Sequence, residues 1–216
     1  MELKNYIEHT LLKPDAKKEE LDKLFQEAKD YGFLGVCVNP INVEYAKSKL
    51  KGTNIKIVTV VGFPLGASLS GIKAFEAIRA IEQGADEVDM VICVQALKNK
   101  EYKYVLNDIK SVKSACGETP LKVIIETDLL EKDEIKKACE LIAEAKADFA
   151  KTSTGFVKNG VGAKVEDVEL MAQTLKGTNV RIKASGGIKD KEKAVKLIEA
   201  GAVRLGTSSG VKLVSD

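Results

Sequence analysis

Two lysines and one aspartate interrupt apolar stretches of the kind that form β-strands. Lys151 lies in Asp-Phe-Ala-Lys-Thr-Ser, Lys183 in Val-Arg-Ile-Lys-Ala-Ser, and Asp89 in Glu-Val-Asp-Met-Val-Ile. Side chains alternate along a strand, so each lysine shares a face with the serine two positions later. If the two lysine-bearing strands are neighbours, their ammonium groups reach the same space. A lysine that loses its proton there can attack a carbonyl carbon and form an imine.

Repulsion between the two ammonium groups gives a physical reason for that reactivity. At a separation of ~6 Å and an effective dielectric constant of ~20, it amounts to roughly 3 kcal/mol. Desolvation acts in the same direction, so the pKa of Lys151 is expected to fall. Two ordinary alternatives stay open. Lysines at strand ends can extend to solvent or pair with carboxylates, and Asp89 can equally be a structural ion-pair partner.

Turns rich in glycine and serine follow the last three predicted strands. In a (β/α)₈ barrel, the loops after strands seven and eight commonly bind phosphate through backbone N–H groups. The sequence therefore predicts a phosphate site, with ordinary turn chemistry as the alternative. Its candidate residues are Gly155, Gly186, Gly187, Ser208 and Ser209.

The elements that must position these residues alternate along the chain as short β-branched runs and longer amphipathic segments. The predicted strands are 6–11, 34–38, 56–61, 87–93, 121–127, 148–153, 180–185 and 203–207. The predicted helices are 20–31, 43–50, 72–83, 100–115, 132–146, 165–175 and 190–200, with at most a short helix at the end. This order favours an α/β fold in which residues 1–216 form a single (β/α)₈ TIM barrel. A doubly wound sheet would usually have fewer strands, and no Gly-x-Gly-x-x-Gly follows the first strand.

Composition excludes several other classes of protein. The 34 basic and 32 acidic residues give a net charge of +2 and are interspersed along helical stretches, which is not typical of a nucleic-acid-binding protein. We expect no membrane partner, because no apolar run reaches spanning length. The only histidine, His9, cannot build a multi-histidine metal site or a catalytic triad. The four cysteines form no Cys-x-x-Cys pair, so a cytoplasmic location with reduced thiols is expected.

Seven segments occur in the order found in one family of aldolases, and they span nearly the whole chain. They are 6–14 (YIEHTLLKP), 35–40 (GVCVNP), 60–66 (VVGFPLG), 86–91 (DEVDMV), 151–155 (KTSTG), 183–188 (KASGGI) and 204–209 (RLGTSS). No single segment is specific, but the combination is. The chain resembles the deoxyribose-phosphate aldolase family, which are class I aldolases with a (β/α)₈ fold.

The resemblance implies reversible cleavage of 2-deoxy-D-ribose 5-phosphate to D-glyceraldehyde 3-phosphate and acetaldehyde. Lys151 matches the imine-forming lysine. Asp89 and Lys183 match the acid/base pair, in which Lys183 also lowers the pKa of Lys151. Cys37 matches a cysteine near the substrate with no necessary chemical role, and the glycines and serines named above match the phosphate site.

The resemblance further implies no metal and no organic cofactor, because the protonated imine is itself the electron sink. It implies a homo-oligomer, either a dimer or a tetramer. One position departs from the pattern. The family usually has Asp where this chain has Glu8, and the added methylene leaves the contact of Glu8 with Lys183 open.

Two rival functions remain at this stage. One is a different imine-forming barrel aldolase or a transaldolase, which would use Lys151 on another sugar phosphate. The other is a non-catalytic barrel that binds a sugar phosphate. Only the first of these would form a covalent adduct on Lys151.

Overall fold

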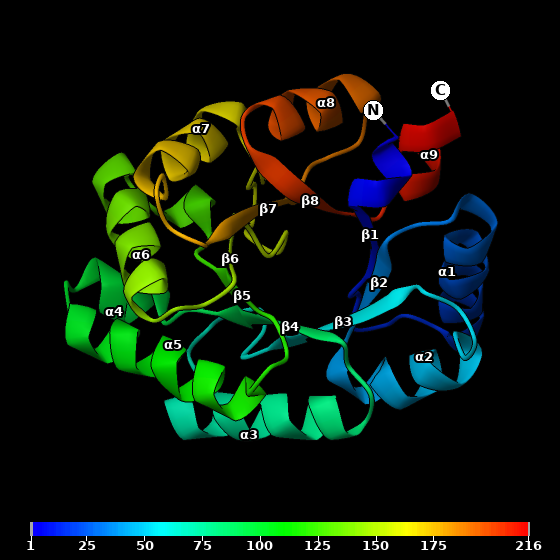
Figure 1. The fold of residues 1–216 in the computed structure, drawn as a ribbon, viewed down its shortest axis with the longest axis horizontal. Coiled ribbons are helices and arrows are strands. Elements are labelled where there is room, and N and C mark those ends of the chain that lie inside the picture. Colours follow the sequence, from blue (N-terminus) through cyan, green and yellow to red (C-terminus); the bar gives the residue numbers. More distant parts are fainter. Residues whose placement is uncertain (1, 216) are drawn as a thin grey trace.

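Eight parallel strands close into a barrel in the computed structural model, which describes residues 2–215. Figure 1 looks along the barrel, with the helices forming an outer ring around the strands. The strands, in chain order, are β1 (Ile7–Leu11), β2 (Gly35–Val38), β3 (Lys56–Val61), β4 (Glu87–Val91), β5 (Leu121–Ile124), β6 (Phe149–Lys151), β7 (Arg181–Ser185) and β8 (Ala202–Thr207). Each strand pairs with the next, and β8 pairs with β1. The predicted (β/α)₈ barrel is confirmed.

The helices follow the strands as the sequence predicts, with a few additions. They are α1 (Lys18–Tyr31), α2 (Val43–Lys49), α3 (Ser70–Glu82), α4 (Val94–Lys98), α5 (Tyr102–Cys116), α6 (Lys132–Glu144), α7 (Val165–Thr174), α8 (Lys191–Glu199) and α9 (Gly210–Ser215). Short 3₁₀ helices are η1 (Leu3–Tyr6), η2 (Pro40–Asn42) and η3 (Thr127–Leu129). None of the helices within residues 2–215 is long and apolar enough to cross a membrane.

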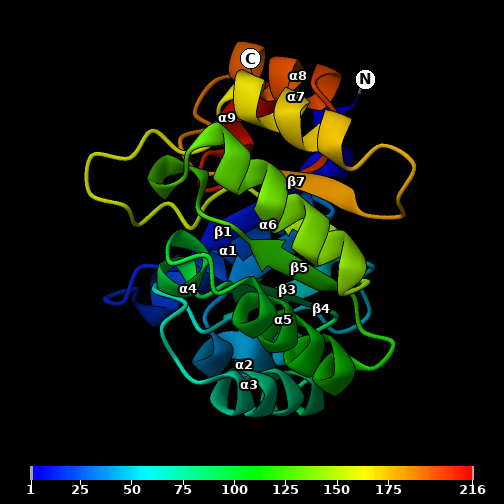
Figure 2. The same cartoon turned by 90° about the vertical axis from the view of Figure 1, so that its left-hand side faces the viewer.

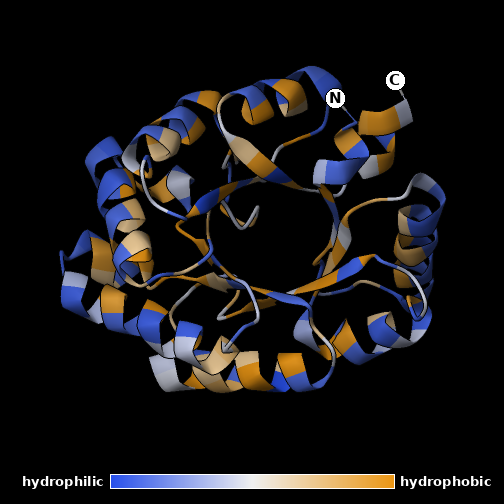
Figure 3. Ribbon diagram, in the orientation of Figure 1, coloured by the Kyte–Doolittle hydropathy of each residue, from blue (hydrophilic) through white to orange (hydrophobic). Residues whose placement is uncertain are grey.

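Local sequence signals explain where helices begin and end. Gly32 adopts a left-handed conformation (φ 65°) that ends α1 and returns the chain towards β2. The Asp190 side chain accepts a hydrogen bond from the backbone N–H of Lys193 and caps α8. Most helices combine apolar and charged residues along their length, as the colours of Figure 3 show, and the residues they bury against the barrel are mostly apolar.

The sequence did not predict α4, and it predicted three strands that are too long. Strands β4, β5 and β6 end at Val91, Ile124 and Lys151, where the predicted strands continued to residues 93, 127 and 153. The residues that directly follow these ends, Ile92, Ile125 and Thr152, are buried although they are not part of a strand. Burial alone does not distinguish a strand from a buried loop, which is why the boundaries were wrong.

The barrel interior holds charged side chains as well as apolar ones. All residues of β4 and β5 are buried, including Asp89 and Lys122. At the amino-terminal end of the barrel, the guanidinium group of Arg181 lies over the ring of Phe149, 4.0 Å from the centroid of that ring. The charged layer therefore lies above this ring, towards the carboxyl ends of the strands.

Candidate active site

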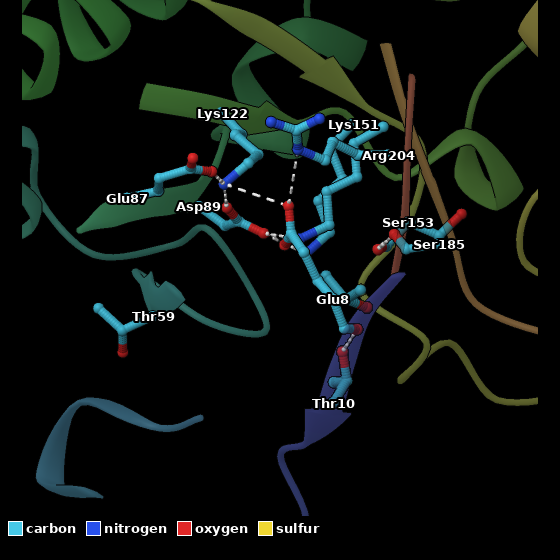
Figure 4. Close-up of polar contacts among 12 residues, drawn as sticks. Glu8, Thr10, Thr59, Glu87, Asp89, Lys122, Lys151, Ser153, Ser185 and Arg204 are labelled. Carbon is cyan, nitrogen blue, oxygen red and sulfur yellow. Dashed lines mark hydrogen bonds and ion pairs between the residues drawn. The ribbon is translucent and has the colours of Figure 1, made fainter. Parts of the chain in front are cut away.

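Strand register brings the two predicted lysines together. Lys151 of β6 pairs directly with Lys183 of β7, and Asp89 of β4 pairs with Lys122 of β5. The Lys151 and Lys183 ammonium groups both donate to Oδ2 of Asp89, at 2.7 and 2.6 Å. Figure 4 shows the labelled side chains of Glu8, Asp89 and Lys122 converging inside the barrel. The inward alternation predicted for β6 and β7 is thus what the structure has.

Asp89 is the centre of a larger charged cluster. Its Oδ1 accepts a hydrogen bond from Lys122 at 2.9 Å, and Lys122 also pairs with Glu87 at 2.6 Å. Glu8 forms an ion pair with the ammonium group of Lys183, so the extra methylene of Glu relative to Asp does not prevent this contact. The cluster is almost completely buried: Asp89, Lys122 and Lys183 are fully enclosed, while Lys151 is 3% exposed.

The charges of this cluster favour a neutral Lys151. Its carboxylates are Glu8, Glu87 and Asp89, and its cations other than Lys151 are Lys122, Lys183 and, 3.8 Å from Glu8, Arg204. These three positive and three negative charges balance without Lys151. A proton on Lys151 would leave one excess positive charge in a buried site, which is unfavourable.

The pKa shifts follow the same logic. Burial lowers the pKa of Lys151, and the Lys183 ammonium group lowers it further, which together outweigh the opposing attraction of Asp89. For Lys183 the balance is reversed, because the carboxylates of Asp89 and Glu8 overcome the effect of burial and raise its pKa. Burial acts to raise the pKa of Asp89, but the ammonium groups of Lys122, Lys151 and Lys183 hold it well below its usual range.

A cavity of about 290 Å³ opens above Lys151. Lys151 lines it, whereas Asp89 and Lys183 lie behind Lys151 and are fully enclosed. Four of the predicted phosphate-site residues line the same cavity: Gly155, Gly186, Gly187 and Ser208. Lys13 and Lys189 add positive charge to the lining. The site therefore combines one lysine of lowered pKa with a ring of backbone amides and cations.

Two predicted residues lie outside this lining. Ser209 faces a neighbouring groove that it shares with Ser208 and His9. Cys37 is buried in a small apolar cluster with Leu12, Val58 and Val60. Burial raises the pKa of the Cys37 thiol, so it is held in its protonated form.

Three residues of the cluster were not predicted from the sequence: Lys122, Glu87 and Arg204. Lys122 is a fourth charged residue inside an apolar run, Leu-Lys-Val-Ile-Ile, and could have been found in the same way as Lys151. Arg204 lies in a segment that resembles the family but had no predicted role. Gly206 explains how Lys183 fits, because a Cβ atom at this position would lie 3.1 Å from Cε of Lys183.

Comparison with known proteins gives a consistent picture. The chain is 51% identical over 216 residues to deoxyribose-phosphate aldolase of Mycoplasmopsis pulmonis, covering 100% of this chain and 97% of that protein. It is 54% identical over 215 residues to deoxyribose-phosphate aldolase of Clostridium novyi, covering 99% and 96%.

Solved structures agree in fold. The deoxyribose phosphate aldolase of Aeropyrum pernix superposes with a TM-score of 0.88 at 32% identity, covering 98% of this chain and 89% of that one. A protein described as QR15, an aldolase, gives a TM-score of 0.93 at 40% identity, covering 99% and 95%. Residues 7–215 match the family described as DeoC/LacD family aldolase, and the chain belongs to that family.

Proposed function

We propose that this protein cleaves 2-deoxy-D-ribose 5-phosphate reversibly to D-glyceraldehyde 3-phosphate and acetaldehyde. The observation that carries the proposal is Lys151, a lysine of lowered pKa at the floor of a cavity lined by glycine amides. The relatives named deoxyribose-phosphate aldolase, which match the full chain at about half identity, support the substrate.

In the proposed reaction, neutral Lys151 attacks the C1 carbonyl of the open-chain sugar, and loss of water gives a protonated imine. A base removes the proton of the C3 hydroxyl, and the C2–C3 bond breaks. Its electrons move to the imine nitrogen, which leaves an enamine on Lys151 and releases glyceraldehyde 3-phosphate. Protonation of the enamine at C2 and hydrolysis release acetaldehyde and return the lysine.

Asp89 and Lys183 are proposed as the acid/base pair for these proton transfers. Oδ2 of Asp89 accepts from both ammonium groups, so it links Lys151 to Lys183. Since Asp89 and Lys183 are both enclosed behind Lys151, we propose that a water molecule carries protons between this pair and the substrate. Lys122 holds the second oxygen of Asp89 and thereby fixes the orientation of the carboxylate.

The substrate phosphate is proposed to bind at the far end of the cavity. Gly155, Gly186 and Gly187 have positive φ angles, which lets their backbone approach an anion closely. Ser208 supplies a hydroxyl group, and Lys13 and Lys189 supply positive charge. Ser209 is retained as a proposed contact from the adjoining groove, and Cys37 as a residue beneath the site.

The decisive experiment is borohydride reduction in the presence of acetaldehyde, followed by peptide mass spectrometry. A two-carbon adduct on Lys151 is expected, together with cleavage of deoxyribose 5-phosphate by the wild type and none by Lys151→Ala. Full activity of Lys151→Ala would refute the assignment. A transaldolase would instead trap a three-carbon ketone fragment from a ketose phosphate, and a binding protein would trap nothing.

We further infer that the chain is a single aldolase domain, acts in the cytoplasm and forms homo-oligomers. The four cysteines are all free thiols, which supports a reducing compartment. The Aeropyrum pernix relative is described as tetrameric, which supports self-association. Helix α3 and the loop before it expose the side chains of Leu65, Leu69, Ile72, Phe75 and Ile78, and we propose this apolar face as the surface that binds a second copy.

A further inference from the structure

Glu126 holds an unusual backbone conformation immediately after β5. Its φ angle is 61°, in the left-handed region that residues other than glycine and asparagine rarely adopt. Just beyond the paired residues of β5 and β6, Ile125 N–H donates to Lys151 O, and Thr127 N–H donates to Thr152 O. The first segment advances by two residues while the second advances by one, so Glu126 is an extra residue between the two contacts. A strained conformation of this kind persists where the surrounding structure requires it.

The carboxylate of Glu126 holds the loop that follows Lys151. It accepts hydrogen bonds from the backbone N–H of Thr154, at 3.1 and 3.3 Å, and from the Thr154 hydroxyl. The same hydroxyl accepts from the backbone N–H of Phe156 at 3.0 Å. Glu126 itself is 3% exposed, and burial raises its pKa. A buried carboxylate thus determines where residues 154–156 lie.

A second carboxylate holds the far end of the same loop. Oδ2 of Asp128, in η3, accepts from the backbone N–H of Gly162 at 2.8 Å. The segment after β5 therefore binds the β6–α7 loop at two points, Thr154 and Gly162. We call this pair of contacts the loop clamp. Figure 2 shows the loop, in yellow-green, projecting from the side of the barrel on which α4 lies.

The clamped loop forms one side of the cavity. Thr154, Gly155 and Phe156 line it directly. The loop is packed tightly against the β7–α8 turn, because a Cβ atom on Gly162 would lie 2.3 Å from the backbone of Gly186. With so little free space, a shift of Thr154 moves Gly155 relative to Gly186. Those two residues lie side by side in the cavity wall, since a Cβ atom on Gly186 would lie 3.6 Å from Cα of Gly155.

We propose that Glu126 is a positioning residue for the substrate phosphate, acting through Thr154 on the placement of Gly155 and Gly186 in the wall of the cavity. Glu126 does not line the cavity and so does not touch the substrate. The inference rests on the proposed function for the identity of the substrate. It predicts that loss of the carboxylate weakens recognition of phosphate while leaving imine chemistry at Lys151 intact.

The test compares deoxyribose 5-phosphate with deoxyribose, which lacks the phosphate, in Glu126→Ala and Glu126→Gly. Both variants should raise KM for the phosphorylated sugar and lower its kcat/KM by between about tenfold and a hundredfold. The kcat/KM for deoxyribose should stay close to that of the wild type. Inorganic phosphate should inhibit deoxyribose cleavage less strongly in both variants. Glu126→Gln should recover most of the loss, because its amide oxygen can still accept from Thr154.

Two controls keep the outcomes distinct. Glycine adopts the left-handed conformation without strain, so Glu126→Gly should fold even if Glu126→Ala does not. Glu140→Ala removes an exposed carboxylate of α6 and should leave the preference for phosphorylated sugar unchanged. Equal losses with both sugars, or no loss with either, would overturn the inference. If the wild type cleaved neither sugar, the proposed function would fail. The role of Glu126 would then be tested by the binding of inorganic phosphate alone, which should be weaker in Glu126→Gly than in the wild type.

Discussion

Lys151 and Lys183 bind the same carboxylate oxygen, yet their effects on stability should be opposite. The pKa of Lys151 is lowered in the fold, so below its unfolded pKa the protonated lysine costs stability. The pKa of Lys183 is raised, so its charge contributes stability at every pH below its unfolded value near ~10.4. Lys151 therefore lowers the stability of the folded protein while it serves the reaction, and Lys183 raises that stability.

The corresponding variants are Lys151→Met and Lys183→Met. Lys151→Met should stabilise the protein by about 1 kcal/mol, which corresponds to a rise in Tm of about 2–4 °C. Lys183→Met should lose about 3–5 kcal/mol, because Glu8 and part of the charge of Asp89 are left buried without a cation. Thermal and guanidinium unfolding at pH 7 measure both effects. A lower Tm for Lys151→Met would show that its ion pair with Asp89 outweighs its burial.

How far the sequence predicts the site depends on the range of the interaction. Lys151 and Lys183 could be predicted, because alternation along one strand fixes the face on which each lies. The contact of Glu8 with Lys183 could be suggested only by the family resemblance, because it joins strands at opposite ends of the chain. Lys122 was overlooked although its signal was present. The left-handed conformation of Glu126 left no signal, since nothing in Val-Ile-Ile-Glu-Thr indicates it.

At the scale of elements, the sequence predicts periodic segments better than it predicts their ends or buried polar contacts. Helix α3 shows this. Its extent was nearly predicted, but nothing in the sequence indicated that Lys73 is fully buried. Its ammonium group donates to Asp108 of α5 at 2.6 Å and to the backbone oxygen of Val91 at 2.9 Å. Lys73 thus ties two helices to the end of β4, two residues from Asp89.

This buried pair leads to a prediction about stability. Lys73→Met should cost about 3–5 kcal/mol, because Asp108 is left as an uncompensated charge. The double variant Lys73→Met/Asp108→Leu should recover most of that loss, since it replaces the pair with apolar side chains. Guanidinium unfolding of the single and double variants measures the coupling. If the double variant lost as much as the sum of the single variants, the two side chains would be acting independently.

At the scale of the whole molecule, the outer face of α3 is unlike those of the other helices. Its inner face packs against the barrel and along α5, as the cartoons show, through residues such as Lys73 and Ala77. Its outer face repeats large apolar residues every third position, with Ile72 58% and Phe75 61% exposed. An amphipathic surface helix normally presents polar residues there. A patch of this kind on the outside of a barrel is typical of a surface that is covered by another chain.

A second copy of this chain is the proposed cover for the outer face of α3. Phe75→Glu should shift the protein to a smaller species in light scattering after size-exclusion chromatography, because it places a charge in the centre of an apolar interface. Leu129→Glu changes another exposed apolar residue, 46% exposed in η3 and away from α3, and should leave the mass unchanged. Since α3 supplies no residue to the cavity, Phe75→Glu should retain borohydride trapping at Lys151. An unchanged mass for Phe75→Glu, or a monomeric wild type, would show that α3 is not the self-association surface.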